Sequence, residues 1–221
     1  MEIKEGHPWL LWPDSVSFNI NKGDIMKTFE GDTDFTLSMR LQLLSKNTEK
    51  KTIFAKLPNY VGVDLIENTN QFLLILNLDK EGEQSWQYLS SDFKLDFEYH
   101  FLTLRYSLER NNIQLLLDDF IVIEYQLEDN EKLSFSDQAH IIFGSGNFPK
   151  NKFNLNYTSY NTDFLLITKE YLDITQIRES YETQNPTKKT VGFYDFKEKT
   201  DYKIYDKTGN CNFIHKILEE L

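Results

Sequence analysis

The densest gathering of side chains suited to ligand recognition lies between positions 151 and 161, in the segment NKFNLNYTSYN. Tyr157 and Tyr160 carry flat rings that can stack on the C–H faces of sugars, and Asn156 and Asn161 carry amides that can bind hydroxyl groups. A chain with 12 tyrosines places some of them in loops by chance, which is the simpler explanation for each residue alone. The cluster as a whole predicts a carbohydrate-binding loop.

A second aromatic pair, Trp86 and Tyr88, interrupts the polar segment from Lys80 to Asp96. This segment is predicted to be a loop, or to contain a strand of its own. In both cases the rings are surrounded by polar residues, as on the surfaces that proteins use for recognition. Trp86 and Tyr88 are therefore further candidates for carbohydrate binding.

The stretch from Asp206 to Asn210, DKTGN, offers the kinds of oxygen that calcium prefers. Calcium takes roughly six to eight oxygen ligands from carboxylates, amides and backbone carbonyls. The alternative is an Asx turn closed by Gly209, in which Asp206 binds its own backbone. Both interpretations remain open at the level of the sequence.

Acid–base chemistry has one candidate, the trio Asp96, Glu98 and His100, which share one face if the segment is a strand. The alternative is a solvated entry to an edge strand. A retaining glycosidase needs two carboxylates about 5 Å apart, and the sequence has no alternating acidic run that would place them so on one strand. It also has no Gly-x-Ser-x-Gly motif and no histidine spacing typical of zinc. We therefore predict no catalytic residues.

The composition limits the possible partners. The 221 residues carry a formal net charge of -11, and the sequence pI is near 4.9. This charge argues against nucleic acid or an anionic membrane, because a phosphate-binding surface must collect lysine and arginine. The sequence shows neither a signal peptide nor an apolar run of about 18 residues, so we expect no membrane span and take the cytoplasm as the default location. A domain cut from a longer secreted chain would look the same.

Patterns of apolar residues predict the elements that must position these groups. Phe35 to Leu43 alternates strictly, which is typical of a half-buried antiparallel strand. Tyr99 to Leu127 reads as three consecutive strands, the last two joined by a reversal at Asp118 and Asp119. A helical period appears near the end, where Asp173 and Gln176 can form a capping box for a helix over 173–181. About a dozen short strands and one short helix predict an all-β fold, a two-sheet antiparallel jelly-roll sandwich.

The order of these elements resembles the laminin G-like, concanavalin A-like jelly-roll domains of lectins, glucanases and bacterial carbohydrate-associated proteins. The matching pieces are DFTLSMRLQLL at 34–44, FEYHFLTLRYS and NNIQLLLDD within 97–119, IIFG at 141–144 and NTDFLLITKEYLDITQIRES at 161–180. The resemblance implies a closing strand that runs into a capped helix. It also implies a structural calcium near Asp206 and Asn210 and near the acid that opens the closing strand, Asp163.

One piece departs from the resemblance. The segment VGFYDFKEKTDYKIYDKTGNCN at 191–212 is similar to the stretch with which such domains open, yet it stands last here. It either folds back to complete a single domain of residues 1–221 or begins a neighbouring domain. We favour the first, because the Trp-rich stretch from His7 to Asp14 is a poor opening strand.

These features predict a non-catalytic, lectin-like domain that binds a glycan as an accessory module of a larger bacterial carbohydrate-active or glycan-biosynthetic protein. Two alternatives stay open, a glycoside hydrolase or lyase on the same fold, and a structural or protein-interaction domain. Inward carboxylates along a groove would favour the enzyme, and a shallow aromatic patch would favour the glycan binder. An apolar strand face left exposed would favour the interaction domain.

Overall fold

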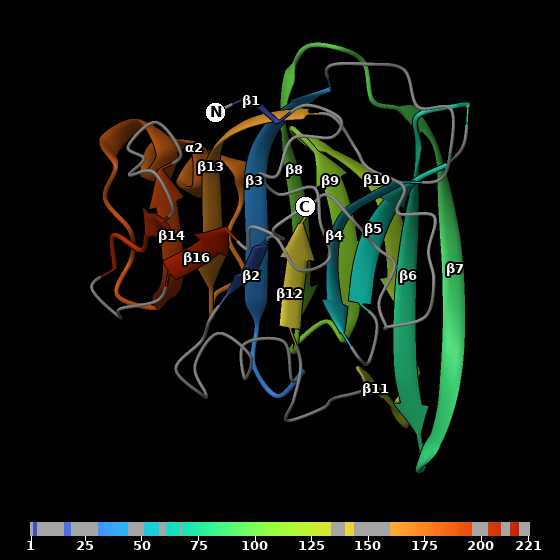
Figure 1. The fold of residues 1–221 in the computed structure, drawn as a ribbon. Coiled ribbons are helices and arrows are strands. Elements are labelled where there is room, and N and C mark those ends of the chain that lie inside the picture. The colour runs from blue at the N-terminus through green and yellow to red at the C-terminus, as the bar shows by residue number, and fades with distance from the viewer. Residues whose placement is uncertain are drawn as a thin grey trace.

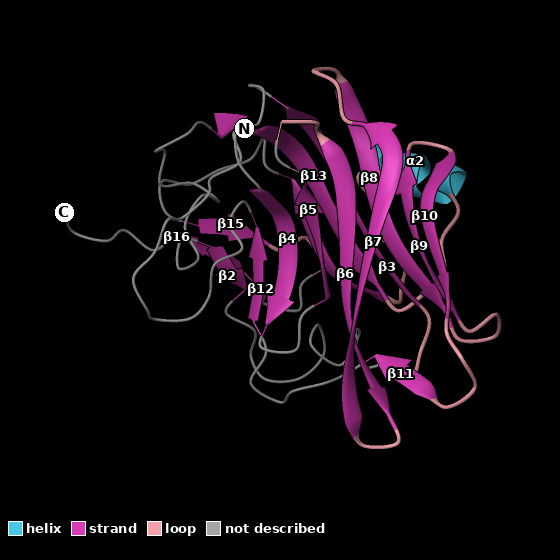
Figure 2. Ribbon diagram, turned by 90° about the vertical axis from the view of Figure 1, so that its right-hand side faces the viewer, coloured by secondary structure: helices cyan, strands magenta, loops and turns pink. Residues whose placement is uncertain are grey.

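The chain forms two antiparallel sheets and one short helix in the part that the structure, a computed structural model, describes (Figures 1 and 2). The described residues are 2–3, 16–18, 31–43, 51–57, 61–66, 68–133, 140–143, 160–195, 203–208 and 213–216. Seven strands make up the first sheet and nine the second. The predicted all-β, two-sheet antiparallel fold is therefore confirmed.

The first sheet has the order β1-β13-β3-β8-β9-β10, and β14 also pairs with β13. Its strands are β1 (Glu2–Ile3), β3 (Phe35–Leu43), β8 (Tyr99–Ser107), β9 (Asn112–Leu117), β10 (Phe120–Gln126), β13 (Tyr160–Thr168) and β14 (Thr190–Asp195). Strand β3 is central because β13 and β8 pair with it on its two sides. The strand predicted at 35–43 and the three-stranded meander predicted at 99–127 are both confirmed.

The second sheet has the order β11-β6-β5-β4-β12-β2-β16-β15, and β7 pairs with the other side of β6. Its strands are β2 (Val16–Phe18), β4 (Lys51–Leu57), β5 (Val61–Leu65), β6 (Gln71–Lys80), β7 (Glu83–Lys94), β11 (Glu131–Leu133), β12 (His140–Phe143), β15 (Lys203–Tyr205) and β16 (Phe213–Lys216). Among the described strands β7 therefore lies at an edge of this sheet.

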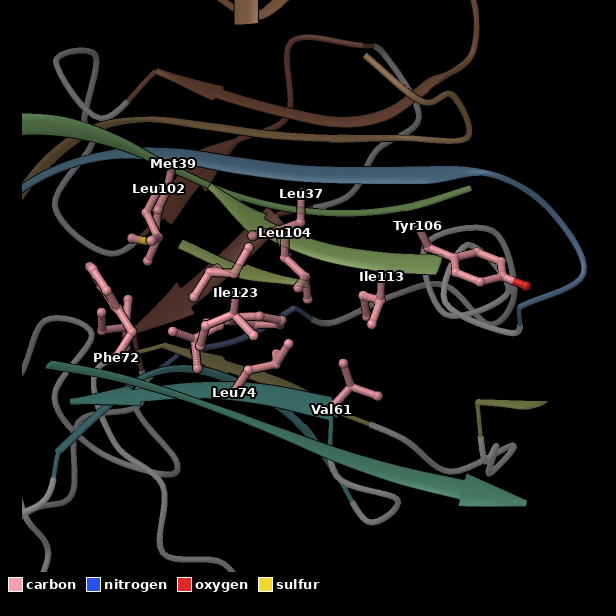
Figure 3. Close-up of a cluster of buried hydrophobic side chains, with 14 of the residues drawn as sticks. Leu37, Met39, Val61, Phe72, Leu74, Leu102, Leu104, Tyr106, Ile113 and Ile123 are labelled. Atoms are coloured by element: carbon pink, nitrogen blue, oxygen red, sulfur yellow. The ribbon is translucent and has the colours of Figure 1, made fainter. Parts of the chain in front are cut away.

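The main core fills the space between the sheets, as Figure 3 shows for Leu37 and Met39 above Leu74 and Phe72. Every second residue of β3 faces this space, and the set Phe35, Leu37, Met39, Leu41 and Leu43 is at most 2% exposed. Burying one such side chain contributes about 1.5–3 kcal/mol. Much of the stability therefore comes from the inner faces of the two sheets.

Helix α2 (Ile174–Thr183) begins at the predicted capping box. The Asp173 carboxylate accepts from the backbone N–H of Gln176 at 2.9 Å, and the Gln176 side chain accepts from the backbone N–H of Asp173 at 2.9 Å. The helix packs Ile177 against Phe164 and Phe193 on the outer face of the first sheet, in a second, smaller core (Figure 2). No helix in the described ranges is long and apolar enough to cross a membrane.

The segment that carries β14 packs onto the first sheet. β14 pairs with β13 from Phe164 to Thr168, and Phe193 and Tyr194 are both 0% exposed. Farther along, Asp206 forms an isolated bridge with Tyr194. The organisation of residues 1–221 as a single domain stays a prediction, which removal of this segment would test.

Candidate functional site

Trp86 and Tyr88 lie on β7, a strand of twelve residues that pairs with β6. The possibility that the polar segment holds a strand of its own is therefore correct. The β6–β7 hairpin turns at Glu81 and Gly82, whose φ angles of 58° and 89° are the left-handed pair that a type I′ turn requires. The Asp79 carboxylate accepts from the Gly82 N–H at 2.8 Å and holds the turn. This turn sets the register of β7.

The outer face of β7 carries four exposed residues in alternation, Gln84, Trp86, Tyr88 and Ser90, which we call the β7 strip. Leu89 points the other way and packs against the main core. Trp86 is 44% exposed and Tyr88 is 62% exposed. Their ring centroids lie 6.4 Å apart and their planes differ by 21°. The strip is thus two nearly parallel aromatic surfaces with a polar residue beyond each.

Strand β6 supplies the neighbours of the two rings. Asn77 lies opposite Trp86 and is 1% exposed, and Ile75 lies opposite Tyr88 and is 4% exposed. The Asn77 Oδ1 atom is buried and has no hydrogen-bond partner among the described residues. The two rings therefore lie next to a well-packed strand, since almost no solvent reaches Asn77 and Ile75 of β6.

Two of the other predicted carbohydrate-binding residues lie on the first sheet. Tyr160 and Asn161 open β13, opposite Leu43 and Gln42 of β3 in the first sheet. Asn156 and Tyr157 fall outside the described residues. The structure therefore separates Trp86 and Tyr88 from Tyr160 and Asn161 into different sheets.

Asp206, the first predicted calcium ligand, closes a local turn. Its Oδ1 accepts from the backbone N–H groups of Phe193 and Thr208, each at 2.9 Å, and its Oδ2 accepts from the Thr208 hydroxyl at 2.6 Å. Asn210 falls outside the described residues. A calcium ion at Asp206 would share Oδ2 with the Thr208 hydroxyl, because a carboxylate oxygen has two lone pairs.

Asp163, the ligand that the resemblance implied, is bound to other side chains. Its Oδ2 lies 2.5 Å from Nη1 of Arg40 and accepts from the Tyr181 hydroxyl at 3.1 Å. The Arg40 guanidinium also lies 4.2 Å from the ring centroid of Tyr99. A cation at Asp163 would compete with this arginine. Within the described ranges no group of three or more histidine, cysteine, aspartate or glutamate side chains could hold a metal ion.

The acid–base trio is assembled differently from the prediction. His100 Nε2 lies 2.8 Å from Asp96 Oδ1, but its Nδ1 lies 2.6 Å from Asp118 Oδ2, and the Glu98 side chain does not take part. Partial burial acts to lower the pKa of His100, yet the hydrogen bonds to Asp118 and Asp96 outweigh it and raise that pKa. The backbone N–H of Glu98 and the contact with His100 lower the pKa of Asp96. Because both ring nitrogens of His100 contact carboxylates, the group connects β8 to the residues before it and to the turn between β9 and β10.

The outer face of the first sheet holds a polar network that the sequence analysis did not single out. Arg105 lies 4.2 Å over the ring of Tyr171, and both donate to Gln114 Oε1, at 3.0 Å from Nε and 2.7 Å from the hydroxyl. Gln114 in turn donates to Glu124 at 2.6 Å. Partial burial lowers the pKa of Arg105. The available signal was the outward alternation of polar residues on β8 to β10, which does not tell which of them meet.

Solved structures share this arrangement of strands. A proposed carbohydrate-binding protein of Bacteroides ovatus ATCC 8483 superposes with a TM-score of 0.63 at 12% identity, covering 92% of this chain and 57% of that one. The binding domain of botulinum neurotoxin serotype D gives 0.55 at 14% identity, with 83% and 42% covered. Botulinum neurotoxin type C, whose cell entry depends on two ganglioside molecules, gives 0.51 at 14% identity, with 85% and 46% covered.

The three similar structures are longer chains, and the similarity is one of fold. This chain spans between 42% and 57% of the length of the three structures. No family model matches the sequence, and no curated protein matches it either. At identities of 12–14% the shared β-rich sandwich is what the superpositions establish.

Proposed function

We propose that this protein is a non-catalytic carbohydrate-binding domain and that the β7 strip is its binding surface. The observation that carries the proposal is the exposed, nearly parallel pair of Trp86 and Tyr88 rings, with Gln84 and Ser90 on the same face. Aromatic faces bury the C–H surface of a sugar, and amide and hydroxyl groups beside them bind its hydroxyls.

The energetics favour a ligand at this place. Apolar surface removed from water contributes about 25 cal/mol per Å², and the two rings keep 44% and 62% of their residues' surface in solvent. The strip belongs to a strand held by β6 along its length, so little backbone freedom is lost when a ligand binds. We expect micromolar to millimolar affinity, about -8 to -4 kcal/mol, because the surface is open and shallow.

The comparisons support the proposal by analogy only. The Bacteroides ovatus protein is itself a proposed carbohydrate binder, and the neurotoxin type C depends on gangliosides. We further propose that this domain is an accessory module beside other domains of a bacterial parent protein, as the sequence resemblance implies.

Two further parts of the proposal come from the sequence. Tyr157 and Tyr160, with Asn156 and Asn161, are proposed as a second carbohydrate-binding segment, of which Tyr160 and Asn161 open β13. A structural calcium is proposed at Asp206, Asn210 and Asp163, on the strength of the oxygen-rich DKTGN sequence and of the resemblance that adds Asp163.

The test compares variants that remove one aromatic side chain each. The assay is a native gel that contains a soluble polysaccharide chosen because it slows migration of the wild-type protein. Trp86→Ala and Tyr88→Ala should each migrate as if the polysaccharide were absent. The matched control is Phe120→Ala, because Phe120 is 66% exposed but lies on β10 of the other sheet. All three variants should melt like the wild type, since exposed rings contribute little to the core. Normal retardation of both strip variants would place the sugar elsewhere.

A protein-interaction role is the second candidate, and one observation favours it. Phe120 and Ile121, 66% and 45% exposed, are consecutive residues of β10, which ends the first sheet. Exposed apolar residues on an edge strand are a place where another strand can add. Sedimentation at rising protein concentration would then show association that Ile121→Lys removes, and a monomer at every concentration would rule out self-association through β10.

A further inference from the structure

The β7 strip is a row of exposed side chains along one strand, and its shape differs from that of a pocket. Its four residues alternate along one strand, so successive side chains are about 6.7 Å apart and the strip is roughly 20 Å long. A pocket for a terminal sugar would bury most of its ligand and the aromatic residues that line it. Here both aromatic residues keep about half of their surface exposed, 44% and 62%.

We propose that the strip binds an internal stretch of a linear, uncharged polysaccharide that lies along β7, with neighbouring sugar rings on Trp86 and Tyr88. This inference rests on the proposed function and names its ligand class. The near-parallel planes, 21° apart, let one extended chain meet both rings with the same face. Gln84 and Ser90 extend the contact by one polar side chain beyond each ring.

Charge around the strip disfavours acidic glycans. Residues 79–94 contain no arginine, the side chain best suited to a carboxylate or sulfate, and they hold four carboxylates against two lysines, namely Asp79, Glu81, Glu83 and Asp92 against Lys80 and Lys94. Lys80 is moreover paired with Glu128, Nζ to Oε2, at 2.5 Å. With a net charge of -11 on the whole chain, the long-range field also repels anions.

The side chains around the rings favour a sugar over a protein as the occupant. The exposed positions from Glu83 to Ser90 hold no aliphatic residue, whereas the buried centre of a protein interface is rich in apolar contacts. What accompanies the rings is one glutamine, one serine and one glutamate. These groups can satisfy hydroxyls, which a polysaccharide presents around every apolar C–H face.

The experiment has two arms on the full chain. Native gels with hydroxyethylcellulose, xylan, galactomannan, amylose or polygalacturonate identify the backbone, and calorimetry then uses the monosaccharide to the hexasaccharide of the best one. We expect retardation by an uncharged polymer and not by polygalacturonate. The association constant should rise at least about tenfold from the disaccharide to the longest oligosaccharide, and level off once the chain exceeds the strip. Both Trp86→Ala and Tyr88→Ala should flatten this dependence, and Phe120→Ala should keep it.

The outcomes separate the two claims. A monosaccharide that binds as tightly as the hexasaccharide overturns the linear-chain inference and leaves glycan binding intact. Stronger retardation by polygalacturonate than by any uncharged polymer overturns the charge argument in the same way. A wild type that no polymer or oligosaccharide binds overturns both this inference and the proposed function.

Discussion

His100 connects three parts of the chain that are apart in sequence. It is the second residue of β8, and it contacts Asp96 before that strand and Asp118 in the β9–β10 turn. Asp118 also accepts from the backbone N–H of Phe101 at 3.0 Å and adopts a left-handed conformation with φ 52°. The imidazole ring between two carboxylates thus fixes this strained turn to the neighbouring strand.

The pKa shifts of this group predict how stability depends on pH. The pKa of His100 is raised above its unfolded value of 6.5, so its contribution is fully present below about pH 6.5 and is lost as the pH rises through the folded pKa. The pKa of Asp96 is lowered, so its contribution is present above about pH 4 and is lost as the pH falls through the folded pKa.

Urea unfolding of the wild type between about pH 5 and pH 9 measures the His100 part of this dependence. His100→Gln should remove most of the decline on the alkaline side, because it cannot become charged. Glu98→Gln is the matched control and should keep the wild-type profile, since the Glu98 side chain does not contact His100. Parallel profiles for wild type and His100→Gln above pH 6.5 would contradict the raised pKa of His100, because they would show that its protonation does not stabilise the fold.

Asp206 allows a separate test of the proposed calcium. An ion that binds only the folded protein stabilises it by RT ln(1 + [L]/Kd), about 2.7 kcal/mol at a hundredfold excess over Kd. Calcium should therefore raise the melting temperature of the EDTA-treated protein. Asp206→Asn keeps an oxygen for the Phe193 N–H but removes the charge, and should abolish the rise. Identical melting with calcium and with EDTA would contradict the site.

At the scale of elements, the β6–β7 hairpin positions the proposed binding surface. Glu81 adopts φ 58° although it has a Cβ atom, whereas Gly82 at φ 89° adopts its conformation without strain. Asn-Gly is the pair that a type I′ turn favours. Glu81→Asn should therefore raise the free energy of unfolding by about 0.5 kcal/mol, and Gly82→Ala should lower it by about 1 kcal/mol. Chemical denaturation of both variants checks the signs, and a stabilising Gly82→Ala would contradict the turn type.

The same hairpin shows where sequence reasoning reaches its limit. Strand β3 was predictable because every inward position is apolar and lies over the centre of the core. On β7 the inward positions Ser85 and Gln87 are polar, since an edge strand reaches only the rim of the core, and the aromatic residues face outward. The apolar periodicity of β7 is therefore inverted, and for this reason the sequence left a loop and a strand open as alternatives for Lys80 to Asp96. The positions of apolar residues in the sequence alone do not tell whether Trp86 and Tyr88 face solvent or the core.

Contacts between residues far apart in the sequence could not be predicted, because they depend on how the strands pair. The capping box of α2 was predictable because its partners, Asp173 and Gln176, are three residues apart. Asp118 as the second partner of His100 depends on the register between β8 and β9 and on the reversal that follows β9. The contact of Arg40 with Asp163 depends likewise on a bulge between Thr162 and Phe164. Each such pairing follows from the assembled sheet.

At the scale of the whole molecule, the late segment from β14 onward should stabilise the sandwich. Phe193 lies in the outer core beside α2, and Tyr194 lies in the main core, both 0% exposed. Removing residues 190–221 should cost several kcal/mol, because each buried aromatic side chain lost costs about 3–5 kcal/mol. Phe193→Ala alone should show the lower part of that loss, with Phe120→Ala as an exposed control. An unchanged unfolding midpoint after truncation would mean that the segment belongs to another domain.

The three tryptophans of the molecule offer the most direct test of its proposed function. Each has one indole N–H signal in a ¹H–¹⁵N NMR spectrum, and Trp86→Phe identifies the signal of Trp86. During titration with the oligosaccharide that binds best, the Trp86 signal should move progressively while those of Trp9 and Trp12 stay in place. Movement of the Trp9 or Trp12 signal with a constant Trp86 signal would contradict the assignment of glycan binding to the β7 strip.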